Sequence, residues 1–145
     1  MMQASDIYTM KGPQAIAKVL PKTASPELLL VSIDDSFARL VNNVASRNWL
    51  VERHNNTSDG ARALSRSGVR LVVFDDQGVA QSERGWLLVQ VRRQKPGVPL
   101  LYVAGIHSDE TEILARRGGA SYYTSKPIHD QQWTSVLRSF MQLHG

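Results

Sequence analysis

The sequence predicts an α/β fold in which an open, five-stranded parallel sheet carries helices on both faces. Short apolar runs at 28–33, 71–75 and 100–104 alternate along the chain with segments of helical spacing. The runs are nearly continuous in apolar residues, as expected of strands that are covered on both faces. Because parallel crossovers are right-handed and lay each helix across a face of the sheet, this alternation indicates a doubly wound arrangement.

Five strand-helix pairs follow one another. The first helix is indicated by Phe37, Leu40, Val41 and Val44 at i, i+3, i+4 and i+7, and the last helix carries a similar stripe. The predicted strands are LLLVSI (28–33), LVERH (50–54), LVVFD (71–75), LLYVA (100–104) and YYTS (122–125), and the helices lie near 36–47, 60–67, 84–93, 109–117 and 130–143.

Aspartates mark three of the predicted helix starts. Asp59, Asp109 and Asp130 stand at the beginning of helical segments, where a carboxylate can accept hydrogen bonds from free backbone N–H groups. We therefore expect these aspartates to cap their helices.

Length and composition indicate one domain. The chain has 145 residues with 42% apolar content, enough for a single ordinary core. Residues 1–27 are rich in proline and lack sustained periodicity apart from a turn or two of helix at 13–20, so we expect an N-terminal extension followed by a domain at 28–143. Because two residues follow the last helix, we expect a stand-alone domain with no output domain.

Composition also excludes several classes of protein. The chain has no cysteine, and its four histidines lack the paired spacing of zinc sites. The net charge of +4 comes from basic residues in scattered short groups, which argues against nucleic-acid binding. Neither a signal peptide nor a stretch of membrane-spanning length is present. We therefore expect a soluble, cytoplasmic protein that binds neither nucleic acid nor membrane.

Acidic residues and a lysine follow the strands. Asp34 and Asp35 follow the first run, Asp75 and Asp76 end the third, and Lys126 follows the fifth. The carboxyl ends of parallel strands share one edge, where such sheets bind ligands. Clustered carboxylates need a cation, for which Mg²⁺ is suited, and a nearby lysine can pair with a phosphate. The set indicates phosphoryl chemistry, although each aspartate alone could simply cap a helix or start a turn.

From Leu28 to Leu143, about four fifths of its length, the chain resembles the receiver domain of two-component response regulators. The motifs that carry the resemblance are IDD (33–35), VVFD (72–75), GGASYY (118–123) and SKP (125–127). The resemblance implies a flavodoxin-like (CheY-like) fold with strand order 2-1-3-4-5.

The resemblance also implies residue roles. Asp75 would accept a phosphoryl group from a sensor histidine kinase or a phosphotransfer protein. Mg²⁺ would be held by Asp34, Asp35 and Asp75 with the backbone carbonyl of Gln77, and Lys126 would contact the phosphate.

Tyr123 matches the aromatic switch position of the family, although a half-buried strand tyrosine would be equally ordinary. The chain departs from the family pattern at three places. Ala104 stands where the switch hydroxyl of a serine or threonine is usual, and Val79 lies near the usual proline after the phosphoacceptor. In a gap-free register Ile33 and Asp34 occupy the positions of the two strand-one acids, whereas a one-residue shift brings both Asp34 and Asp35 into place.

Three functions follow from these observations. The first is a non-enzymatic receiver, a phosphoprotein that signals by binding a downstream partner or a second copy of itself. Its expected surface includes Arg116, Arg117, Tyr122 and Gln131. The alternative is a degenerate pseudo-receiver that acts as a phosphorylation-independent interaction module. A flavin or nucleotide enzyme is disfavoured, and no organic cofactor is expected, because 32–38 (SIDDSFA) contains no glycine to shape a phosphate-binding loop.

Overall fold

The computed structural model describes residues 25–45 and 47–144. Within them, strands and helices alternate as β2 (Glu27–Val31), α1 (Asp35–Ala45), β3 (Leu50–His54), α2 (Thr57–Ala63), β4 (Val69–Asp75), α3 (Gln81–Gln94), β5 (Leu100–Ala104), α4 (Asp109–Arg117), β6 (Tyr122–Ser125) and α5 (Asp130–His144). β2 begins one residue before the predicted start of the domain. The helical turns expected at 13–20, and most of the expected extension, lie outside the described residues.

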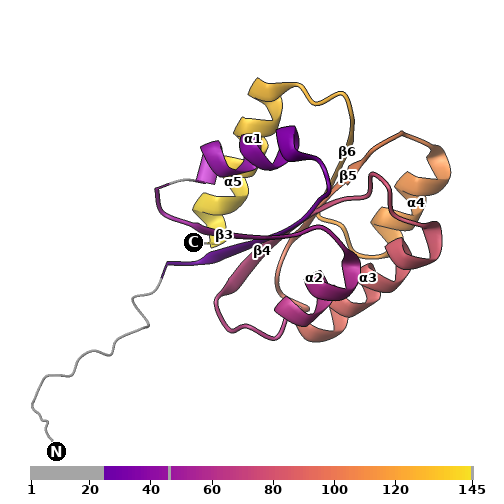
Figure 1. Cartoon of the computed structure of the whole chain (residues 1–145), viewed down its shortest axis with the longest axis horizontal. Helices are drawn as coiled ribbons and strands as arrows, with labels where there is room; N and C mark the ends of the chain where they lie inside the picture. The colour runs from indigo at the N-terminus through magenta and orange to yellow at the C-terminus, as the bar shows by residue number, and fades with distance from the viewer. Residues whose placement is uncertain (1–24, 46, 145) are drawn as a thin grey trace, which may run out of the picture.

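The five strands form one parallel sheet in the order β3-β2-β4-β5-β6. Counted along the described chain this is the order 2-1-3-4-5, so the predicted flavodoxin-like topology is confirmed. Helices α1 and α5 lie on one side of the sheet, and α2, α3 and α4 lie on the other (Figure 1).

Two hydrophobic cores, one on each face, explain why the strands are apolar throughout. In β2, Leu28 and Leu30 pack beneath α1 and α5, whereas Leu29 and Val31 pack on the opposite face. Alternate side chains of a strand point to opposite faces. A strand covered on both sides therefore buries consecutive residues, and all four of these side chains are almost fully buried.

Two helices begin earlier than predicted, and none of the three expected aspartate caps precedes its helix. α2 starts at Thr57 rather than near residue 60, because the side chain of Asn56 accepts a hydrogen bond from the Asp59 N–H. α4 is capped in the same way by Ser108, and α5 begins at Asp130 itself, so all three aspartates lie inside the first helical turn. α3 begins at Gln81 without a side-chain cap. The capping residue is the extended one just before the helix, which apolar periodicity alone does not reveal.

The carboxyl ends of all five strands meet at one edge of the sheet, where the loops after β2, β4, β5 and β6 begin. The peptide bond between Lys126 and Pro127, just after β6, is cis. None of the helices within residues 25–45 and 47–144 combines the length and the apolar content needed to cross a membrane.

Candidate functional site

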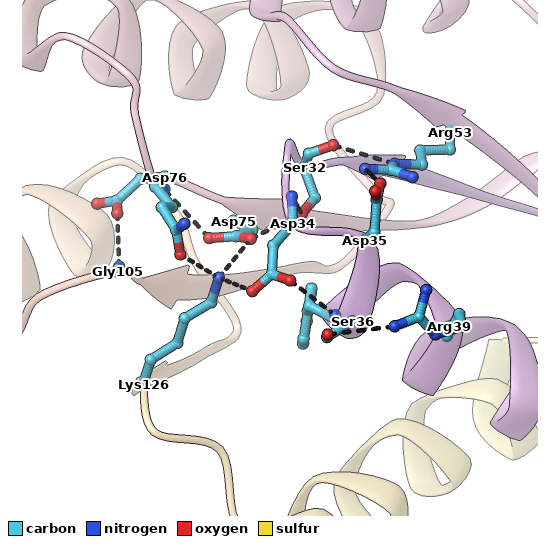
Figure 2. Close-up of polar contacts among 12 residues, drawn as sticks. Ser32, Asp34, Asp35, Ser36, Arg39, Arg53, Asp75, Asp76, Gly105 and Lys126 are labelled. Atoms are coloured by element: carbon cyan, nitrogen blue, oxygen red, sulfur yellow. Dashed lines mark hydrogen bonds and ion pairs between the residues drawn. The ribbon is translucent and has the colours of Figure 1, made fainter.

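Lys126 lies at the centre of a polar cluster on this edge. Its Nζ donates hydrogen bonds to Asp34 Oδ2 at 2.7 Å, to Asp75 Oδ2 at 2.8 Å and to the side-chain Oε1 of Gln77 at 2.7 Å (Figure 2). The three partners lie 92, 51 and 49 residues before Lys126 in the chain. The fold therefore places two carboxylates and an amide oxygen around one cationic group.

Asp75, the last residue of β4, has no solvent-exposed surface. Its Oδ2 accepts from the hydroxyl of Ser32 at 2.7 Å as well as from Lys126, and its Oδ1 accepts from the Gln77 N–H at 3.1 Å. Each carboxylate oxygen thus has a donor, as a buried charge requires.

The two carboxylate oxygens of Asp34 accept hydrogen bonds from two different donors. Its Oδ1 accepts from the Phe37 N–H at 3.1 Å and caps α1, while its Oδ2 accepts from Lys126. The hydrogen bond from Lys126 is the main reason why the pKa of Asp34 lies below its usual value. The N–H of Asp34 also donates to the Ser32 hydroxyl, which ties the loop after β2 to Asp75.

The surroundings of Lys126 stabilise its charged form. Burial acts to lower its pKa, but the hydrogen bonds and charges of Asp34 and Asp75 together outweigh burial and raise it above the usual value. The ammonium also lies 5.5 Å from the centre of the Phe37 ring, a distance at which cation–π attraction contributes. Lys126 therefore acts as the internal counter-ion of the two aspartates.

Asp35, one of the predicted metal ligands, does not join the cluster around Lys126. It is the first residue of α1, and its carboxylate forms an ion pair with Arg53 at 2.9 Å (Figure 2). Arg53 also donates to the carbonyl of Ser32 at 3.1 Å. Asp34 thus meets Asp75 through Lys126, whereas Asp35 meets Arg53.

Gln77 reaches the cluster through its side chain, whereas the sequence prediction concerned its backbone carbonyl. Ser32 was missed by sequence reasoning, because a small hydroxyl in an apolar run gives a weak signal. It could have been found from strand alternation, since Ser32 and Lys126 continue the face of the sheet on which Asp75 lies.

Asp76 is the second residue that the sequence analysis left without a role. It is almost fully buried, and its Oδ2 accepts from the hydroxyl of Tyr102 at 2.6 Å. Its Oδ1 accepts from the Gly105 N–H at 2.7 Å, and Arg84 Nε lies 3.5 Å from Oδ2.

The two predicted switch positions lie beside this second network. Ala104 ends β5 and is fully buried, with no hydroxyl to offer. Tyr123 is half-buried on β6, and its hydroxyl lies 2.9 Å from Nδ1 of His107. Ser108 caps α4, so its hydroxyl is engaged away from the acidic cluster.

The cluster has the donor chemistry of a site for a hard cation. In the part of the chain that the structure describes, no three histidine, aspartate or glutamate side chains gather closely enough to form a metal site. Mg²⁺, however, needs only one or two protein carboxylates together with waters and a phosphate oxygen. Asp34, Asp75 and the Gln77 amide oxygen already share one cation, so this donor set fits the ion.

Comparisons with known proteins rest on structure. No family model and no curated protein matches the chain. A response regulator receiver domain protein (CheY-like) from Methanospirillum hungatei is 19% identical with a TM-score of 0.72, and the match covers 83% of this chain and 97% of that one. The signal receiver domain of an HD domain-containing protein from Pseudomonas fluorescens is 21% identical with a TM-score of 0.71, over 83% and 97% of the two chains.

A response regulator from Thermotoga maritima is 18% identical with a TM-score of 0.70, over 81% of this chain and 98% of that one. An orphan response regulator of Helicobacter pylori is 14% identical with a TM-score of 0.69, over 81% and 97%. The matches cover 97–98% of each of these four chains. The chain therefore has the fold of the response regulator receiver domains.

Proposed function

We propose that this chain is a receiver module of a two-component phosphorelay, which accepts a phosphoryl group on Asp75 and signals by binding a protein partner. The observation that carries the proposal is the convergence of Asp34 and Asp75 on Lys126, within 2.8 Å, from positions up to 92 residues apart. Packing does not require two aspartates and a lysine to meet at the edge of a sheet where ligands bind.

The chemistry proposed is a single transfer to the protein's own side chain. A carboxylate oxygen of Asp75 forms a bond to phosphorus while the bond between phosphorus and the donor histidine nitrogen breaks. The electron pair stays on that nitrogen, which takes up a proton. Because Asp75 has no exposed surface, Lys126 must move from the carboxylate to the incoming phosphoryl oxygens, where its point charge stabilises them.

Asp34, Asp75 and the Gln77 side chain are the residues proposed to hold Mg²⁺. The ion would supply positive charge against the phosphoryl oxygens, and it would replace Lys126 as the counter-charge of Asp34. The proposed donors are a sensor histidine kinase or a phosphotransfer protein. The proposed partner surface is formed by α4, β6 and α5, where Arg116, Arg117 and Gln131 are exposed.

Intact mass after incubation with Mg²⁺ and acetyl phosphate tests the proposal. The expected result is an increase of one phosphoryl group that disappears in Asp75→Asn and persists in Asp35→Asn, the matched acid outside the cluster. An adduct that survives in Asp75→Asn would refute the assignment of the acceptor.

The pseudo-receiver is the second candidate, and a specific observation favours it. Ser32 places a hydroxyl, rather than a carboxylate, against Asp75, and together with Lys126 and the Gln77 N–H it occupies both oxygens. Ser32→Asp adds a carboxylate at this point. If the adduct forms in Ser32→Asp but not in the unmodified chain, the module has lost its ability to bind the metal and acts without phosphorylation.

A further inference from the structure

Asp76 connects the acidic cluster to the opposite face of the sheet. Successive side chains at the end of β4 point in opposite directions, so Asp75 faces Lys126 while Asp76 faces Gly105 (Figure 2). The N–H of Asp76 donates to the carbonyl of Val103 at 2.9 Å, which fixes the backbone between the two aspartates. The two carboxylates therefore share one short stretch of backbone, so a displacement of Asp75 is passed to the carboxylate of Asp76.

Gly105 brings the loop after β5 against the loop after β4. A Cβ atom at Gly105 would lie 3.2 Å from Cα of Gln77 and 3.6 Å from Oδ1 of Asp76. This approach lets the Gly105 N–H reach Oδ1 of Asp76 at 2.7 Å. A buried carboxylate thus holds the first residue of the surface loop 105–108.

Tyr102 carries the same connection across the sheet. It is fully buried, donates its hydroxyl proton to Oδ2 of Asp76, and lies opposite Tyr123 in the pairing of β5 with β6. The two rings stack with centres 5.8 Å apart and planes 23° apart. The hydroxyl of Tyr123 meets His107, which follows Ile106, a residue with 86% of its surface exposed.

A packing role alone does not account for this network. A carboxylate that is 2% exposed is costly to bury, and an apolar pair of similar volume would fill the same space at no such cost. The network joins the residue beside Asp75 to a loop that presents a large apolar side chain to solvent. It does so at the strand end where Ala104 lacks a hydroxyl.

We propose that Asp76 and Tyr102 transmit the state of Asp75 to the surface loop 105–108 through Tyr123, as the switch of this chain in place of a hydroxyl at position 104. The inference rests on the proposed function in that phosphorylation of Asp75 is the event transmitted. When Asp75 changes, the Asp76 carboxylate shifts, Gly105 and the Tyr102 hydroxyl follow it, and the exposure of Ile106 changes.

The test uses NMR of the full chain with 3-fluorotyrosine and ¹⁵N labels. Asp75→Asn is the perturbation, so the test does not depend on phosphorylation. We expect it to shift the fluorine signal of Tyr123 and the amide signals of residues 105–108. In the Tyr102→Phe background we expect most of these shifts to be lost, while the shifts of Asp34 and Lys126 persist.

Tyr122→Phe is the matched control, because Tyr122 lies beside Tyr123 on β6 but packs on the opposite face of the sheet, against α1 and α5. It should leave the response of Tyr123 unchanged. If Tyr102→Phe does not fold, Asp76→Asn replaces it as the interrupting variant. Equal shifts with and without Tyr102→Phe, or no shift at Tyr123 in the unmodified background, would overturn the coupling. A missing phosphate adduct would overturn the proposed function only.

Discussion

Replacing Lys126 by methionine tests how strongly the acidic cluster depends on its internal cation. Methionine keeps much of the apolar length over the Phe37 ring but removes the ammonium. Asp75 is then left with no exposed surface and no opposite charge, and Asp34 loses the group that lowers its pKa.

Removing one partner of a buried ion pair costs about 3–5 kcal/mol. Two features of the structure place the expected loss near the lower end. Asp75 keeps the donors of Ser32 and Gln77, and the side chain of Asp34 is 24% exposed, so water can stabilise it. We therefore expect Lys126→Met to lower the free energy of unfolding by about 3 kcal/mol.

Urea unfolding at neutral pH, followed by circular dichroism, measures this loss. Lys95→Met is the control, since Lys95 is the other lysine within the described residues and its ammonium forms no ion pair there; it should stay within about 0.5 kcal/mol of the unmodified chain. Adding Asp75→Asn to Lys126→Met removes the unpaired charge and should recover about 1–3 kcal/mol. A loss below 1 kcal/mol for Lys126→Met, or no recovery in the double variant, would refute the argument.

Three further predictions concern the fold and its electrostatics. Gly60→Ala should destabilise the chain by about 1–3 kcal/mol in the same urea assay. The added Cβ would lie 2.6 Å from a methyl carbon of the buried valine that ends β2. The control Gly85→Ala should not destabilise the chain, because its Cβ would meet a leucine methyl at the ordinary contact distance of 3.8 Å. Ser108→Ala should cost about 1 kcal/mol by removing the cap of α4, and an unchanged unfolding midpoint would contradict this. Because the pKa of Asp34 is lowered in the folded state, its contribution to stability is present above its unfolded-state pKa and is lost as pH falls through the folded one. A ¹³C titration of Asp34 should therefore show a higher pKa in Lys126→Met, and an unmoved curve would argue against the pairing.

Most of the strands and helices could be predicted from local sequence patterns. The strands at 50–54, 100–104 and 122–125 and the helix at 109–117 agree with the structure residue for residue. Continuous apolar runs identify strands that are covered on both faces, and those runs also fix which loops share an edge of a parallel sheet. Helix starts were less predictable: α2 begins three residues early because Asn56 caps it through a hydrogen bond that leaves no mark in apolar periodicity, and α3 begins three residues early with no side-chain cap.

The polar networks depended on geometry that spacing does not encode. The sequence by itself determined the layered fold, the edge where the loops meet, and the candidacy of Asp34, Asp75 and Lys126. Only the tertiary structure decided that Asp35 pairs with Arg53. Only the tertiary structure brought Ser32 to Asp75 and buried Asp76 against Tyr102 and Gly105. The physical reason is that an apolar pattern reports on the residues of a single strand or helix. The direction of a polar side chain at a strand end, by contrast, is set by donors that arrive from other loops.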